Sequence, residues 1–396
     1  MNGMKVTKRP SLFATVSFAL CLGFAPSIGF SFADDIDSAF DREIRDPIRF
    51  LIDAYSAKDV LVLENSNHVN YKIYDQILAL LRKVGTDENL KYVVLERFHD
   101  ASEFYRALSV NSLETAIPKL GSAYAKRNSL CTSPEWAYVI AKVMPEMRRI
   151  NRLRPPENPL IVTSIDELTA ERDVLWPASL DKGFSWDAFY KRTKVDWKPN
   201  CESNSYSNSS IVPILATSRT RESGTADRFI KFMERLGPRR KAIVMYHFSH
   251  AIRGVQSCSP ELNADSTWTV AQGPESWMQI ALNKNRRLGE RIFSVLFDEI
   301  SRSNPNGVLT LSAREAKRHP GRDFGVSLRN LSGLSSKRGM GLFQPNSFLF
   351  GYNASSTDAA LDDLFDGVVW NHDSSERYRL SEKASDYLPA YCEPDA

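Results

Sequence analysis

Residues 59–68 read DVLVLENSNH, and this stretch decides the fold class. Four apolar residues, Val60 to Leu63, follow one another without interruption, which is typical of a strand buried on both faces of a parallel sheet. Residues from about 69 to 84 follow with an apolar face at helical spacing, closed by Gly85. A buried strand that leads into an amphipathic helix is the repeating unit of an α/β fold.

The same alternation continues along the chain. Further apolar runs lie at residues 92–95, 160–162, 242–246, 308–311 and 367–370, and helical patterns lie at about 112–127, 134–150, 225–236 and 276–300. The sequence therefore predicts a doubly wound, mainly parallel sheet with helices on both faces. Two stretches, 175–212 and 256–275, break the pattern. We expect them to be long insert loops in a single domain that spans residues 34–396.

The first 33 residues are typical of an export signal. Three basic residues precede an uncharged apolar run at 12–32, and Ser31-Phe32-Ala33 forms a small-x-small cleavage site. The alternative is an uncleaved membrane anchor, because the run is about long enough to cross a bilayer. Pro26 and Gly29 near its end favour cleavage. The sequence thus predicts a secreted or periplasmic protein with no stable membrane span after signal cleavage.

The charge of the chain depends on this segment. The whole chain has 51 basic and 48 acidic residues. Cleavage after residue 33 removes three bases and no acid, so the processed chain is neutral. A neutral chain has no charge excess that calls for a nucleic-acid partner.

Four cysteines remain after cleavage, and they are Cys131, Cys201, Cys258 and Cys392. Their wide spacing without a Cys-x-x-Cys motif argues against a zinc knuckle. An even number in an exported protein favours disulfide bonds, although three pairings are open and free buried thiols are the alternative.

Ionisable side chains follow the predicted strands. They are Glu64 and His68 after the first run, Glu96 after the second, Asp166 after the third, and His247 and His250 after the fourth. Because the carboxyl ends of parallel strands meet at one edge of the sheet, we expect these side chains to gather there. Histidines and carboxylates in one place can transfer protons or bind a divalent metal. The chain has no Gly-x-Ser-x-Gly, His-Glu-x-x-His or P-loop motif, which disfavours the enzyme classes that use them.

Several short segments resemble one superfamily. The strand at Val60 with the turn to His68 is similar to the strand and Gly-Glu-x-x-His turn of erythromycin esterase-like, ChaN-like and TraB/Tiki proteins. Residues 92–96, 243–254 and 365–369 resemble later strands of that superfamily in the same order. The chain reads Glu64-Asn65-Ser66-Asn67-His68 where the superfamily has Gly-Glu-x-x-His, so it resembles a divergent member.

The resemblance implies a hydrolase that acts on an ester or amide, with a small-molecule or peptide substrate. His68 would act as general base on water, Glu96 would orient it, and His250 would polarise the carbonyl group. Glu64 and His247 complete the candidate catalytic set. A divalent metal held by Glu64, His68, Glu96 and His250 stays open, because the Tiki-like members depend on a metal.

Two alternatives to hydrolysis remain. The ChaN-like proteins suggest haem or iron binding, with Tyr246, His247 or His250 as an axial ligand. The altered turn at Glu64 to His68 suggests a non-catalytic scaffold of the same fold.

Overall fold

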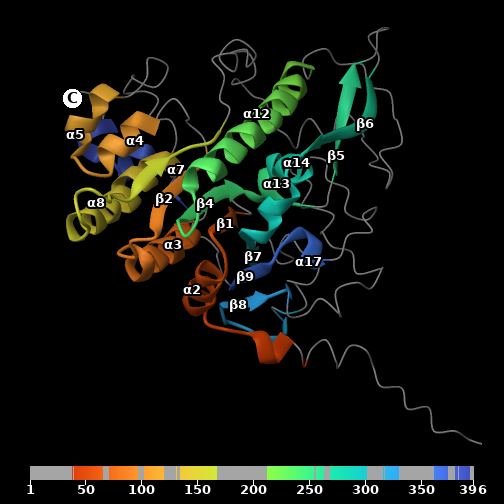
Figure 1. Cartoon of the computed structure of the whole chain (residues 1–396), viewed down its shortest axis with the longest axis horizontal. Coiled ribbons are helices and arrows are strands. Elements are labelled where there is room, and N and C mark those ends of the chain that lie inside the picture. Colours follow the sequence, from red (N-terminus) through yellow and green to blue (C-terminus); the bar gives the residue numbers. More distant parts are fainter. Residues whose placement is uncertain are drawn as a thin grey trace, which may run out of the picture.

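The computed structural model describes the residues 38, 40–65, 71–96, 102–119, 131, 134–166, 212–253, 256–262, 268–300, 315, 317–329, 361–372, 380–381 and 383–392. Its main feature is a seven-stranded sheet with the strand order β3-β2-β4-β1-β7-β9-β8 (Figure 1). These strands are β1 (Val60–Asn65), β2 (Leu90–Leu95), β3 (Ile161–Thr163), β4 (Lys241–His247), β7 (Ile292–Ile300), β8 (Phe324–Ser327) and β9 (Gly367–His372). All neighbouring strands are parallel except β8, which runs antiparallel to β9.

Helices cover both faces of this sheet, as the sequence predicts. One face carries α2 (Pro47–Ala57), α3 (Tyr71–Val84), α7 (Pro134–Tyr138) and α8 (Met144–Leu153), and the other carries α12 (Val212–Leu236), α13 (Phe248–Ala251) and α14 (Trp277–Lys284) (Figure 1). Alternate residues of β1 separate the two cores: Leu61 and Leu63 face α3, whereas Val60 and Val62 face α12. The prediction of a doubly wound α/β architecture is therefore confirmed.

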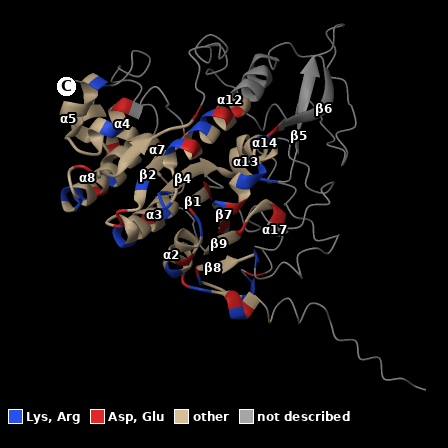
Figure 2. Cartoon of the chain, viewed as in Figure 1, with Lys and Arg blue, Asp and Glu red and all other residues tan. Residues whose placement is uncertain are grey.

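Smaller elements complete the described chain. They are α4 (Ser102–Leu108), α5 (Leu113–Ala116), α17 (Leu361–Leu364), α18 (Pro389–Cys392), the 3-10 helices Ile117–Lys119, Arg286–Glu290 and Ala384–Asp386, and a π-helix at Val139–Val143. Lys and Arg are interspersed with Asp and Glu along α12 and over the helices near it (Figure 2). Within the described residues, no helix is both long and apolar enough to cross a membrane.

Glycines let α2 pack closely on the end of the sheet. Asp46 caps α2 by accepting the backbone N–H groups of Ile48 and Arg49, and Pro47 opens the helix. The ring of Phe50 then lies against Gly325 of β8 and Gly367 of β9, where an added Cβ would overlap it. Glycine is therefore required at both positions for α2 to reach β8 and β9.

Two expectations from the sequence are wrong. The pattern at 276–300 is not one helix: α14 ends at Lys284, and Ile292–Ile300 form the inner strand β7 between β1 and β9. The stretch 256–275 is not an unstructured loop but an antiparallel hairpin of β5 (Gln256–Leu262) and β6 (Trp268–Glu275), outside the main sheet. The run at 308–311 and the insert at 175–211 lie outside the described residues.

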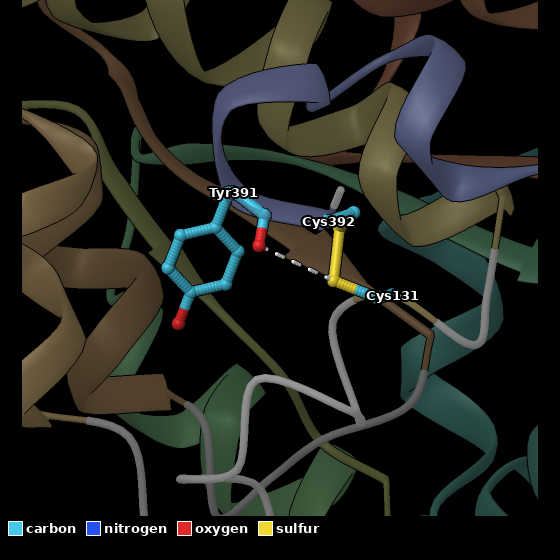
Figure 3. Close-up of a disulfide and its surroundings, with 3 residues drawn as sticks. All are labelled: Cys131, Tyr391 and Cys392. Atoms are coloured by element: carbon cyan, nitrogen blue, oxygen red, sulfur yellow. Dashed lines mark hydrogen bonds between the residues drawn. A yellow bond between two sulfur atoms is a disulfide. The ribbon is translucent and has the colours of Figure 1, made fainter. Parts of the chain in front are cut away.

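One cysteine pairing is settled among the described residues. Cys131, just before α7, is bonded to Cys392 in α18, 261 residues later (Figure 3). The sulfur of Cys131 also lies 3.9 Å from the carbonyl oxygen of Tyr391 (Figure 3). The bond ties the C-terminal helix to the face of the sheet covered by α3 and α7.

Candidate active site

The carboxyl ends of β1, β2 and β4 lie side by side. Asn65 at the end of β1 is opposite His247 of β4, and Leu95 at the end of β2 is opposite Met245 of β4. After β1 the chain crosses to β2 on one side of the sheet, whereas after β4 it crosses to β7 on the other side of β1, so the direction of winding reverses between β1 and β4. Ligands of doubly wound sheets bind at such a switch point, outside the carboxyl ends of the strands.

Glu96 and His247 link the ends of β2 and β4. The backbone N–H of Glu96 donates to the carbonyl of Met245 at 2.9 Å, which continues the sheet past β2. One carboxylate oxygen of Glu96, Oε2, accepts the backbone N–H of His247 at 2.7 Å. The ring of His247 is buried and packs against Phe248. Both the backbone and the carboxylate of Glu96 are therefore fixed in position at the carboxyl edge of the sheet.

His250 lies next to Glu96 because α13 turns directly off the end of β4. The distance from His250 Nε2 to Glu96 Oε1 is 3.9 Å, and the His250 side chain is 17% exposed. Its ring centre is 6.2 Å from that of His247. The structure thus brings Glu96, expected after the second strand, together with His247 and His250, expected after the fourth.

Glu222 of α12 is a site residue that the sequence reasoning missed. Its Oε1 lies 2.5 Å from Nδ1 of His250, and its Oε2 accepts the backbone N–H of Trp277 at 2.8 Å. Only 5% of Glu222 is exposed. A signal for it exists in the sequence, because Glu222 shares one helical face with the buried residues Ala226, Phe229 and Met233.

Glu64 belongs to a different set of contacts. It lies on the β1 face that is covered by α12 and α13, and it is completely buried. Burial raises the pKa of Glu64 well above its usual range; the nearby Asp366 adds to the increase, and Arg253 opposes it. We take Glu64 to be a neutral acid beneath α13.

Asp366, just before β9, organises the surroundings of Glu64. Its Oδ2 accepts the backbone N–H of Ser294 at 2.7 Å, and its Oδ1 accepts Nε of Arg329 at 2.6 Å. Arg253 Nη2 lies 3.1 Å from the same Oδ1. The carboxylate of Asp366 thus connects β7, β9, the end of β8 and the segment after α13. These contacts give Asp366 and Arg253 a structural role.

The remaining predicted residues are only partly placed. His68 lies outside the described residues. Asp166 is completely buried three residues after β3, and its carbonyl accepts Nη1 of Arg228 at 2.9 Å. Across the part of the chain that the structure describes, no three His, Cys, Asp or Glu side chains gather as a metal-binding group. A metal site that includes His68 stays a prediction.

No protein-family model and no curated protein matches the chain. Similar solved structures include a Bacillus cereus protein, with a TM-score of 0.45, 10% identity, and coverage of 87% of this chain and 98% of that one. A succinoglycan biosynthesis protein has a TM-score of 0.46, 12% identity, and coverage of 88% and 98%. A mutant of the erythromycin esterase EreC in its open conformation has a TM-score of 0.44, 11% identity, and coverage of 84% and 98%.

Proposed function

We propose that this chain is an exported hydrolase that cleaves an ester or amide by general acid–base catalysis at the carboxyl edge of β1, β2 and β4. The observation that carries the proposal is the pairing of Glu96 Oε1 with His250 Nε2 at 3.9 Å. This distance is too long for a direct hydrogen bond. A water or substrate hydroxyl between the two atoms could contact both of them, which is the arrangement needed to move a proton.

Each residue has a definite task in this reaction. His250 Nε2 accepts a proton from the attacking water while the oxygen of that water bonds to the carbonyl carbon of the substrate. Glu96 holds that water from the other side. When the carbon–oxygen or carbon–nitrogen bond of the substrate breaks, His250 returns the proton to the leaving group. From the sequence, His250 is expected to polarise the carbonyl group of the substrate, and His68 is expected to act as the general base. The carboxylate of Glu222, which contacts Nδ1 of His250, supports proton transfer as the role of His250. His68 stays an expected further residue at this edge of the sheet.

Export is part of the proposal. The signal-like first 33 residues support it, and so does the disulfide between Cys131 and Cys392, because such bonds persist in oxidising compartments. The substrate would then be met outside the cytoplasm, in the periplasm or the surrounding medium.

A substrate screen with matched variants tests the proposal. The purified protein is assayed with p-nitrophenyl butyrate as the ester and a peptide p-nitroanilide as the amide. We expect His250→Asn and Glu96→Gln each to lower kcat on the order of 100-fold or more. His319→Asn is the control, because His319 lies in the segment before β8 and pairs with Asp41 instead. Equal activity of all variants would contradict the proposal, and a stoichiometric Soret band would favour the haem alternative.

A further inference from the structure

We infer that Glu222 is the positioning residue of this site, which fixes the ring of His250 so that Nε2 is the nitrogen presented to Glu96. The inference rests on the proposed function for its catalytic consequence. Its structural part, the orientation of the ring, can be measured without a substrate.

The first step concerns the anchoring of the Glu222 carboxylate. One oxygen meets His250 Nδ1 at 2.5 Å, and the other accepts the N–H of Trp277 at 2.8 Å. Trp277 is the first residue of α14, so this N–H has no partner within its own helix and favours a negative charge. With both oxygens engaged, the carboxylate cannot rotate away from His250.

The second step concerns the rigidity of the anchor. Trp277 is completely buried, and its ring packs against Phe229 of α12 at 4.8 Å and Tyr246 of β4 at 5.2 Å. Ser276, which precedes it, caps α14 by accepting the N–H of Gln279 and donates to the carbonyl of Ile252. Glu222 is thus held by a packed aromatic core and not by a surface loop.

The third step is the chemical consequence for His250. A carboxylate can only accept hydrogen bonds, so a neutral imidazole beside Glu222 must carry its proton on Nδ1. The lone pair then lies on Nε2, the nitrogen that faces Glu96. When Nε2 takes up a proton, the charge of Glu222 stabilises the imidazolium. Without Glu222, the proton is free to move to Nε2, which would then have no lone pair to accept a proton from water.

Nitrogen-15 NMR of the histidine-labelled protein tests this assignment directly. The His250 signal is identified by its absence in His250→Asn. We expect the wild-type ring in the Nδ1–H tautomer and a loss of that preference in Glu222→Gln, whose amide can donate as well as accept. Glu234→Gln is the control, since Glu234 is an exposed glutamate on the same helix.

Kinetics with the ester and amide probes provide the second readout. Glu222→Gln should lower kcat on the order of 100-fold with little change in KM, because it alters proton transfer and not binding. Glu222→Asp keeps the charge and should retain the Nδ1–H tautomer with part of the activity, which guards against a variant that fails to fold. An unchanged tautomer in Glu222→Gln would overturn the inference. If the wild type hydrolyses neither probe but the tautomer responds, the proposed reaction fails and the positioning role stands.

Discussion

The carboxylate of Glu96 accepts the backbone N–H of His247 at 2.7 Å, across 151 residues of sequence. This bond makes the ends of β2 and β4 one structural unit. The bond involves Oε2 of Glu96, whereas Oε1 lies 3.9 Å from Nε2 of His250. Structure and proposed chemistry therefore depend on different atoms of one side chain, and the two can be separated by mutation.

The first prediction separates these two tasks of Glu96. Glu96→Ala leaves the buried N–H of His247 without this acceptor, which should cost about 1–3 kcal/mol of unfolding free energy. Glu96→Gln keeps an acceptor oxygen and should remain within about 1 kcal/mol of the wild type, yet lose the activity. Urea unfolding beside hydrolysis of p-nitrophenyl butyrate measures both. Equal stability of the two variants would rule out the bond to His247 as a structural link.

The second prediction concerns pH and Glu64. Its raised pKa means that the folded chain binds this proton more tightly than the unfolded chain does. Protonated Glu64 contributes its full share to the free energy of unfolding below the pKa that it has in the unfolded chain. This contribution is lost as the pH rises towards its pKa in the folded chain, and the free energy of unfolding falls by at most about 1.4 kcal/mol per pH unit. Glu64→Gln cannot ionise. Relative to the wild type it should become steadily more stable above pH ~4.5.

Denaturant unfolding between pH 4 and pH 8 checks this sign. Glu234→Gln serves as the matched control, because it makes the same substitution at an exposed position. A wild-type protein that gains stability over Glu64→Gln with rising pH would show that Glu64 is buried as a carboxylate.

The third prediction tests Asp366 as the link between strands. Asp366→Asn removes the charge that Arg253 and Arg329 share, and it should destabilise the fold by about 3–5 kcal/mol. Asp53→Asn is the control: Asp53 pairs with Arg49 on the surface, where both side chains are more than half exposed, so it should cost less than about 1 kcal/mol. Thermal and urea melts compare the two. Similar losses from both changes would contradict the structural role.

The fourth prediction concerns the disulfide. Cys131→Ser and Cys392→Ser should each destabilise the fold by about 2–5 kcal/mol, because the bond closes a very long loop in the unfolded chain. The double variant should be no less stable than either single one, since both remove the same bond. Additive losses, measured under oxidising conditions, would mean that the two cysteines act separately.

Much of the fold could be predicted from local sequence, and the exception has a physical reason. The runs at β1, β2, β3, β4 and β9 are short, apolar and β-branched, and each became a strand. The sequence predicts a helix over 276–300, and the spacing of Phe293, Leu296 and Phe297 is compatible with a helix as well as with the strand Ile292–Ile300. An apolar run buried on both faces has no periodicity that separates the two structures. Only its neighbours β1 and β9 determine that it is a strand.

The site was harder to predict than the sheet. The proximity of Glu96, His247 and His250 could be predicted because strand ends of a parallel sheet converge. Glu222 could not be found in that way, since it comes from a helix that crosses the sheet and reaches His250 only in the folded chain. Glu64 follows the same strand rule, yet its side chain faces inward to Arg253 and Asp366. The convergence of strand ends predicts that Glu64 lies at the carboxyl edge of the sheet. The alternation of side-chain directions along β1 decides on which face of the sheet its side chain lies.

A double-mutant cycle on hydrolysis shows whether Glu96 and His250 act on the same proton. The kcat values of the wild type, Glu96→Gln, His250→Asn and the double variant are measured with the same ester and amide probes. If the two side chains act on one proton, the double variant should be about as slow as the slower single variant. Two independent effects that multiply, or rates equal to the wild type, would mean that Glu96 and His250 do not share a proton in catalysis.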